Sequence, residues 1–315
     1  MRGLVFRPQL WIAAITLSGL INCASYAQVA GHYVGGITGL ENGTAPPPGF
    51  FGSFLPYVNH ITSIKGPAGH TALTLDFNLT AYNNVFAVTT EKKFLGGEYG
   101  LDVIIPVVNT RFVANQFNAS EAQAGLSDCY FAPLVLGWEK GKFDFTANYG
   151  FYAPTGQFDP AKSLNAGLGF WEQQIQAGST WNIDKLKLWN ASLLTTWEFN
   201  QSTIGKDVRA GPMFTGEYSF GRRFDKYQMN AGVAGFAYKK LSADSGSGVN
   251  PLTAGVLDRQ FGIGGEWKYT NIKWHLAFDV RYETQFGVEA KTSGPVFVFG
   301  ITYLSLLPPP AAPHK

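Results

Sequence analysis

Long stretches of this chain alternate apolar and polar residues with a period of two. In residues 143–151 the odd positions carry Phe, Ala and Tyr, and the even positions carry Asp, Thr, Asn and Gly. Residues 71–81, 189–200 and 274–283 repeat this alternation. Successive side chains of an extended chain point to opposite faces, so the pattern predicts β-strands with one apolar and one polar face. Such strands form sheets whose apolar faces must be covered by protein or by lipid.

The predicted strands are long. Strands in soluble proteins usually have about 5–6 residues, whereas a tilted strand needs about 9–11 residues to cross a bilayer, so these lengths favour a membrane. An even number of strands is also typical of single-chain bacterial barrels. The twelve predicted strands are residues 71–81, 84–94, 98–112, 126–139, 142–152, 168–181, 187–200, 208–220, 227–240, 257–269, 273–285 and 294–305.

The connections between these strands alternate in length. The short ones are 95–97, 140–141, 184–186, 221–226 and 270–272, and the long ones are 113–125, 153–167, 201–207, 241–256 and 286–293. Outer-membrane barrels pair short periplasmic turns with long outer loops in this way. We therefore predict an all-β fold, an antiparallel transmembrane β-barrel of about 12 strands. The alternative is a soluble β-sandwich, in which nearly every strand would need a second sheet to cover its apolar face.

The first residues of the chain have the features of an export signal. Two arginines precede an apolar stretch, and cleavage after Ala27 fits the preference for small residues, which predicts a signal peptide over residues 1–27. A lipoprotein site at Cys23 is the alternative, although the preceding Asn22 is not a small residue. Export of a barrel-forming chain predicts localisation in the bacterial outer membrane, with membrane lipid as a partner.

The charge balance bears on the class of partner. The chain has 24 Lys and Arg against 22 Asp and Glu, and removal of the two signal-peptide arginines leaves equal numbers. A surface that binds nucleic acid needs an excess of basic residues to replace the counterions of phosphates. We therefore expect no nucleic-acid partner.

The sequence has no recognisable catalytic motif. None of the five histidines lies in a nucleophile motif, and Cys129 is the single cysteine outside the signal peptide. We also find no metal-ligand spacing, phosphate-binding loop or dinucleotide fingerprint. The prediction is a protein that is not an enzyme, with no catalytic residues, no metal ligands and no cofactor.

Three parts are predicted after the signal peptide. Residues 28–66 are rich in Gly, Pro and aromatic residues without a period of two, so we predict an irregular segment that either plugs the barrel or tethers it. Residues 67–306 are predicted to form the barrel. The Pro-rich residues 307–315 are predicted to form an extended tail.

If the apolar faces of the strands meet lipid, the polar faces line a lumen. Carboxylates outnumber basic groups on these faces, which favours the passage of cations or neutral solutes over anions. The alternative is that these charges pair with one another and brace the barrel wall. The predicted lumen residues are Asp76, Asp102, Asp128, Asp144, Glu172, Glu198, Arg209, Glu217, Glu266, Lys268, Asp279, Arg281 and Glu283.

Several motifs resemble those of a known family. They are GLSDCYFAP at 125–133, FDF at 143–145, YGFYAPTGQFDP at 149–160, Asn165, GLGFW at 167–171, GFAY at 235–238 and DSGSG at 244–248. With these motifs the chain resembles the family named for the MetA pathway of phenol degradation, over about residues 30–305. The resemblance implies an outer-membrane β-barrel transporter. The family is in turn similar to the secretion channel for functional amyloid, a twelve-stranded barrel with an N-terminal plug.

The most specific motif, residues 150–171, runs from one predicted strand through a long loop into the next. Its prolines and glycines fix the turns of the loop. We predict that its large side chains form a constriction or a solute-contact surface at the outer mouth; the alternative is that they only pin the loop to the rim. The residues concerned are Tyr152, Phe158, Asp159, Phe170 and Trp171.

The function predicted from the barrel and the resemblance is passive diffusion of small solutes, with aromatic or otherwise hydrophobic compounds implied by the family. Two alternatives stay open. One is a plugged channel that exports a polypeptide, although this chain has no heptad segment before the barrel. The other is a structural or adhesion barrel that does not conduct. A homo-oligomer is compatible with the sequence.

Overall fold

A computed structural model describes residues 30–114, 119–162, 164–224, 228–250 and 254–306. These residues form fourteen strands, all of them paired antiparallel. The predicted signal peptide and the predicted Pro-rich tail lie outside the described residues. No helix in the described part of the chain is long and apolar enough to cross a membrane.

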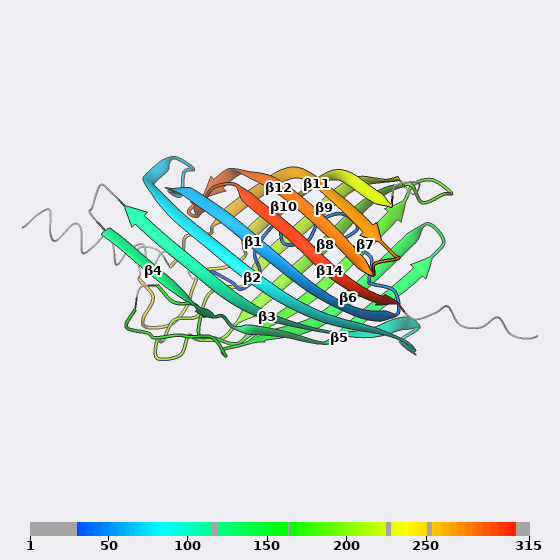
Figure 1. Ribbon diagram of the computed structural model, residues 1–315. Helices are drawn as coiled ribbons and strands as arrows, with labels where there is room; N and C mark the ends of the chain where they lie inside the picture. Colours follow the sequence, from blue (N-terminus) through cyan, green and yellow to red (C-terminus); the bar gives the residue numbers. More distant parts are fainter. Residues whose placement is uncertain (1–29, 115–118, 163, 225–227, 251–253, 307–315) are drawn as a thin grey trace, which may run out of the picture.

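Twelve strands close into a barrel, seen from the side in Figure 1. Each pairs with the next along the chain, and β1 pairs with both β2 and β14, which closes the sheet. The short β4 (Ala119–Leu126) continues the sheet beside β3, and β13 (Thr292–Ser293) pairs with β1. The barrel strands are β1 (Gly49–Lys65), β2 (Thr71–Phe94), β3 (Gly97–Ala114), β5 (Cys129–Lys140), β6 (Phe143–Ala153), β7 (Glu172–Asn182), β8 (Trp189–Asn200), β9 (Met213–Phe224), β10 (Met229–Lys240), β11 (Arg259–Asn271), β12 (Leu276–Glu289) and β14 (Val296–Leu306). The predicted fold class is confirmed.

The predicted total of twelve strands is right through two errors that compensate. The predicted strands 71–81 and 84–94 are not separate, because residues 71–94 form the single strand β2 with no turn at residues 82–83. The side-chain amides of Asn83 and Asn84 donate to the carbonyls of Leu55 and Ile105 on the two neighbouring strands, so these turn-forming residues brace the sheet instead.

The missing strand is β1, which lies within the segment predicted to be irregular. The barrel therefore begins at Gly49 and not at residue 67. The strand was not predicted because it contains Gly52 and Pro56, and both residue types are unusual in strand interiors. From Leu55 onwards the alternation is present, since Tyr57 and Ile61 are buried.

The two ends of the barrel differ. The short connections β2–β3, β5–β6, β7–β8, β9–β10 and β11–β12 lie at one end, which we call the short-turn end. The long connections, including residues 154–171, 201–212 and 241–258, lie at the other, which we call the long-loop end. The N-terminal segment, defined as residues 30–48, joins β1 at the short-turn end.

The outward face carries a broad apolar surface. Aromatic side chains stack on one another near the short turns, for example Phe143 on Trp181 and Trp189 on Phe220. All four are at least 39% exposed. An exposed apolar band with aromatic residues at its border is typical of a lipid-facing barrel wall.

The inward face has two chemically different halves. From β7 to β12 it carries buried carboxylates, amides and hydroxyls, among them Glu172, Thr196 and Glu217. From β1 to β3 it is mainly apolar, with side chains such as Leu79 and Val108 lining cavities inside the barrel. The lumen is therefore polar on one side and apolar on the other.

The predicted facing of residues 71–81 is wrong. Leu79 and Ala81 line an interior cavity, while Tyr82 and Phe86 are exposed, so the odd positions of β2 face inward. The 24 residues of β2 exceed the roughly 9–11 that a tilted strand needs to cross a bilayer. An outward polar side chain near the end of so long a strand can therefore stand in water, beyond the apolar layer.

Candidate functional site

The N-terminal segment runs through the inside of the barrel. Figure 1 shows it in dark blue, enclosed by the strands. Its backbone N–H groups donate to carboxylates of the polar half: Tyr33 to Glu198 at 3.0 Å, Gly36 to Glu217 at 2.7 Å and Leu40 to Glu266 at 2.6 Å. Glu217 also accepts from the backbone of Thr38 and from the Tyr33 hydroxyl. We call Glu172, Glu198, Glu217 and Glu266 the carboxylate ladder.

Basic side chains hold the carbonyl groups of the same segment. Arg281 donates to the carbonyls of Gly36 at 3.1 Å and Ile37 at 2.8 Å, and Lys268 donates to the carbonyl of Leu40 at 2.8 Å. Both basic groups also form ion pairs with Glu266, at 3.2 Å from Arg281 and 3.1 Å from Lys268. The charged wall thus supplies hydrogen-bond partners for both the N–H and the carbonyl groups of this irregular segment, whose backbone is not paired in a helix or a sheet.

Glycine is required where the segment lies closest to the wall. A Cβ atom on Gly39 would overlap the Glu266 carboxylate and the Arg281 guanidinium. Gly36 has a φ of +83°, a conformation that other residues rarely adopt, and its N–H donates to Glu217. The glycine content of this segment therefore follows from its close approach to the carboxylate ladder.

His32 fastens the segment at the long-loop end. Its ring nitrogens lie 3.0 Å from Glu172 and 2.9 Å from Asp128, and its backbone N–H also donates to Glu172. The ring stacks on Tyr152 with centroids 4.5 Å apart and meets the edge of Phe170 at 4.7 Å. Burial by itself would lower the pKa of His32, but the two carboxylates outweigh it and raise the pKa from 6.5 to about 9. The imidazole is therefore charged at neutral pH.

Asp128 joins His32 to the long loop. It lies in the connection between β4 and β5 and accepts N–H groups from Gly156 at 2.9 Å, Leu168 at 2.7 Å and Gly169 at 3.1 Å. Burial would raise the pKa of Asp128, but the hydrogen bonds from His32 and from the loop backbone lower it overall. One carboxylate thus ties loop 154–171 to the N-terminal segment.

Asp128→Asn should release this loop. An amide cannot accept every N–H that the carboxylate accepts, and a buried hydrogen bond to a charged group contributes about 1.5–3 kcal/mol. We expect trypsin to cleave after Lys162 on the order of tenfold faster in the variant. The control is Asp184→Asn, whose carboxylate caps the short β7–β8 connection at the opposite end. Equal cleavage rates in all three proteins would show that Asp128 does not hold the loop.

Most of the predicted lumen residues point into the barrel. Many of them contact the N-terminal segment or one another and do not line an open channel. The residues of the carboxylate ladder, Lys268 and Arg281 contact the N-terminal segment. Asp144 accepts from Asn182 and from Thr44 of that segment, and Glu283 lies 3.5 Å from Arg281. Asp279 lies opposite Gly300, and Asp102 lines a cavity beside the N-terminal segment.

Two predicted lumen residues do not face the lumen. Asp76 lies on the outward face of β2, exposed, 3.7 Å from His60 of β1. Arg209 is exposed in the connection between β8 and β9, where its side chain donates to the carbonyl of Asn200. Strand β9 begins only at Met213, because Gly211 and Pro212 interrupt the strand predicted from residue 208.

The residues predicted at the outer mouth separate into two groups. Tyr152, Phe158 and Phe170 face the interior, where Phe158 and Phe170 line a cavity and Tyr152 stacks on His32. Trp171 is 43% exposed and packs near Phe151 on the outside of the barrel. Asp159 is exposed and accepts the N–H of Ala161, so it stabilises a turn of the loop.

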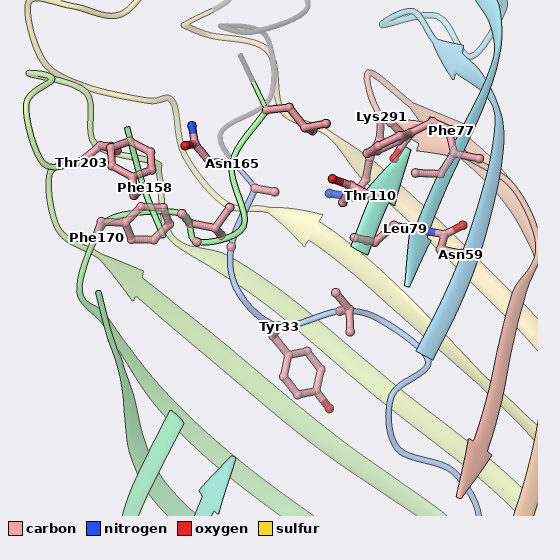
Figure 2. Close-up of a pocket in the computed structure, with 18 of the residues that line it drawn as sticks. Tyr33, Asn59, Phe77, Leu79, Thr110, Phe158, Asn165, Phe170, Thr203 and Lys291 are labelled. Atoms are coloured by element: carbon pink, nitrogen blue, oxygen red, sulfur yellow. The ribbon is translucent and has the colours of Figure 1, made fainter. Parts of the chain in front are cut away.

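Two cavities lie beside the N-terminal segment. The mouth cavity, of about 440 Å³, lies at the long-loop end. Figure 2 shows Phe158, Asn165 and Phe170 on one side of it, Asn59, Phe77 and Leu79 on the other, and Tyr33 of the segment beneath. The central cavity, of about 510 Å³, lies deeper, between the segment, the apolar wall of β1 to β3 and polar side chains of β6 and β7 such as Asn148 and Gln174. Both cavities are lined by Val34, Leu79 and Thr110, so they adjoin one another.

Sequence reasoning missed the residues of the N-terminal segment that make these contacts, above all His32, Tyr33 and Gly39. A signal was present, since glycines recur through residues 31–43 beside a wall rich in carboxylates. The pairing of that segment with the charged faces could not be read from either part alone.

Comparison with known proteins identifies the family. A family model described as "Putative MetA-pathway of phenol degradation" matches residues 63–297. The chain belongs to this family. Among curated proteins, no sequence matches the chain significantly.

Solved structures agree on the fold. The COG4313 outer membrane channel from Pseudomonas putida F1 is similar with a TM-score of 0.70 and 12% identity, covering 84% of this chain and 98% of that one. The β domain of the Bordetella autotransporter BrkA is similar with a TM-score of 0.50 and 10% identity, covering 81% of this chain and 99% of that one. At these identities the likeness concerns the barrel alone.

Proposed function

We propose that this family member is an outer-membrane channel through which small, uncharged, hydrophobic solutes such as aromatic compounds diffuse passively. The observation that carries the proposal is the pair of adjoining cavities along the apolar half of the wall. The N-terminal segment is held on the polar half by the carboxylate ladder, so one side of the remaining space is bordered by apolar side chains such as Leu79, Val85 and Ile104. Uncharged polar side chains such as Asn148 and Gln176 border the other side. The similar solved structure from Pseudomonas putida F1 is an outer membrane channel, which supports a channel role.

The lining favours apolar over ionic solutes. An ion in the central cavity would lose hydration against apolar side chains and find few compensating charges, which is costly. A hydrophobic ring instead gains from leaving water, by about 25 cal/mol for each Å² of buried apolar surface. The charges once expected to select ions are already bound to the N-terminal segment.

Uptake by intact cells tests the proposal. The chain would be expressed in a porin-deficient strain with a lipopolysaccharide outer membrane, and entry of radiolabelled toluene would be compared with entry of a pentose. We expect faster toluene entry, with little change for the pentose. Ala81→Trp, which fills the central cavity, should remove most of the gain, and Gly66→Ala, at an open position in the β1–β2 connection, should not. Equal gains for the two solutes would refute the hydrophobic route.

We further propose that the N-terminal segment acts as a plug for ions and that His32 is part of its latch. The His32 pKa, raised from 6.5 to about 9, means that the protonated ring stabilises the docked segment fully below about pH 6.5. This stabilisation is lost as the pH rises through about 9. The charged groups that face the ring are Asp128 and Glu172, with Glu198 beyond them.

The latch predicts more frequent opening at alkaline pH. In planar bilayers, the wild-type protein should show channel openings that become more frequent between pH 7 and pH 10. His32→Gln should open often at pH 7 and change little with pH, because its side chain cannot be charged. His70→Gln, in the exposed β1–β2 connection, should behave as the wild type. A pH dependence that survives in His32→Gln would place the latch elsewhere.

A further inference from the structure

The central cavity contains polar groups that its own wall leaves without partners. Asp102 lies on the inward face of β3, in line with Ile104, Pro106 and Val108, which are apolar. Among the described residues, its carboxyl group has no hydrogen bond and no ion pair. A carboxyl group in an apolar wall is costly unless a donor reaches it.

A second polar group lines the same cavity. Gln174 of β7 is 2% exposed, and its Nε2 atom has no acceptor among the described residues. The N-terminal segment adds Asn42, whose side-chain oxygen and nitrogen are both buried without partners among the described residues. Buried polar side chains are nearly always hydrogen-bonded, so a solute in the cavity, or water when it is empty, supplies the partners of these groups.

The positions of these groups indicate what kind of ligand fits. Apolar side chains such as Leu79, Val85 and Leu194 border the cavity between them, and its volume of about 510 Å³ accommodates a substituted ring. Asp102 offers only acceptors when it is ionised and repels anions, so it favours a donor on an uncharged or cationic solute. The amides of Gln174 and Asn42 can meet an oxygen on the solute.

We propose that the central cavity is a binding site for small, uncharged ring compounds that carry a hydroxyl group, with the hydroxyl donating to Asp102. This proposal rests on the proposed channel function and narrows its solute class from hydrophobic compounds to hydroxylated ones. Gln174 is a second specificity-determining residue, which binds an oxygen of the solute. A ring without a donor would leave Asp102 unpaired and bind more weakly.

Binding of matched solutes to the full chain in detergent micelles tests the proposal. The probes are benzyl alcohol and its methyl ether, which share a ring and differ in the hydroxyl donor, and Kd would be measured by NMR titration. We expect the wild type to bind benzyl alcohol about fivefold to tenfold more tightly than the ether, the effect of about one net hydrogen bond. Asp102→Leu should remove this preference while leaving the affinity for the ether equal or higher.

The control and the second variant separate the outcomes. Asp76→Asn changes a carboxylate on the outward face of the neighbouring strand and should keep the wild-type preference. Gln174→Leu should weaken benzyl alcohol binding severalfold, and correct folding of each variant is checked by its heat-dependent mobility on gels. Equal binding of both probes by wild type and Asp102→Leu would overturn hydroxyl recognition while leaving the hydrophobic channel intact. Binding of neither probe by the wild type would count against the channel proposal itself.

Discussion

Deleting residues 30–46 should turn a weakly conducting barrel into an open, cation-selective pore. The N-terminal segment occupies the polar half of the lumen and satisfies the carboxylate ladder through its backbone N–H groups. Without the segment, these carboxylates and Asp144 would face water and attract cations. A twelve-stranded barrel is intermediate in width between filled eight-stranded and open sixteen-stranded barrels, so the conductance should rise on the order of tenfold.

The deletion has to stop before β1. Residues 28–66 are the whole segment that the sequence predicts to be irregular. Deleting all of them would also remove β1, a barrel strand that pairs with both β2 and β14. Single-channel conductance and reversal potentials in a potassium chloride gradient provide the measurement. The mobility of the unheated protein on gels shows that the shortened barrel has folded.

A point variant of unchanged length gives the matched comparison. Gly39→Leu places a side chain where Glu266 and Arg281 already lie, so the segment should be displaced and conductance should rise as in the deletion. Gly66→Ala should have no effect, because the nearest atom would be 3.8 Å from the new Cβ. Unchanged conductance in both the deletion and Gly39→Leu would show that the segment does not block ions, and would favour a diffusion route that bypasses it.

Arg281→Leu should destabilise the protein by about 3–5 kcal/mol, the usual cost of removing one partner from a buried charge network. Arg281 is 2% exposed and lies 3.2 Å from Glu266 and 3.5 Å from Glu283, and it also binds two carbonyls of the N-terminal segment. Leucine leaves the two carboxylates without this cation and the two carbonyls without donors. The free energy of unfolding would be measured by urea denaturation in lipid vesicles.

Two further variants show whether charge is the cause. Arg222→Leu removes an outward arginine that lies over the Trp189 ring and should cost less than about 1 kcal/mol. Adding Glu266→Gln and Glu283→Gln to Arg281→Leu should restore part of the lost stability, because the unpaired charges are then removed. A loss below about 1 kcal/mol for Arg281→Leu would mean that water in the lumen already solvates these carboxylates.

The strands with one apolar and one polar face were predictable because their signal is local. In β6, β8 and β12 nearly every second residue is apolar, with Thr195 and Thr284 as exceptions, and this alternation assigns Phe143 and Trp189 to the outside and Asp144 and Glu198 to the inside. The same reasoning was wrong for β2. Apolar side chains of this strand face the lumen, and an outward polar side chain near its end stands in water beyond the apolar layer of the membrane. Asp76 was misplaced for that reason.

The sequence by itself determined the barrel and the glycine-rich nature of the segment before β1, because period, length and turn composition are properties of neighbouring residues. The total of twelve strands was right only because one missed strand, β1, offset the division of β2 into two. Only the tertiary structure decided what the charges do. His32 meets Glu172 across 140 positions of sequence, and Gly36 meets Arg281 across 245. A carboxylate looks the same in sequence whether it lines water or accepts a backbone N–H. Because the barrel closes around the N-terminal segment, the carboxylate ladder binds that segment, and space remains beside the apolar half of the wall.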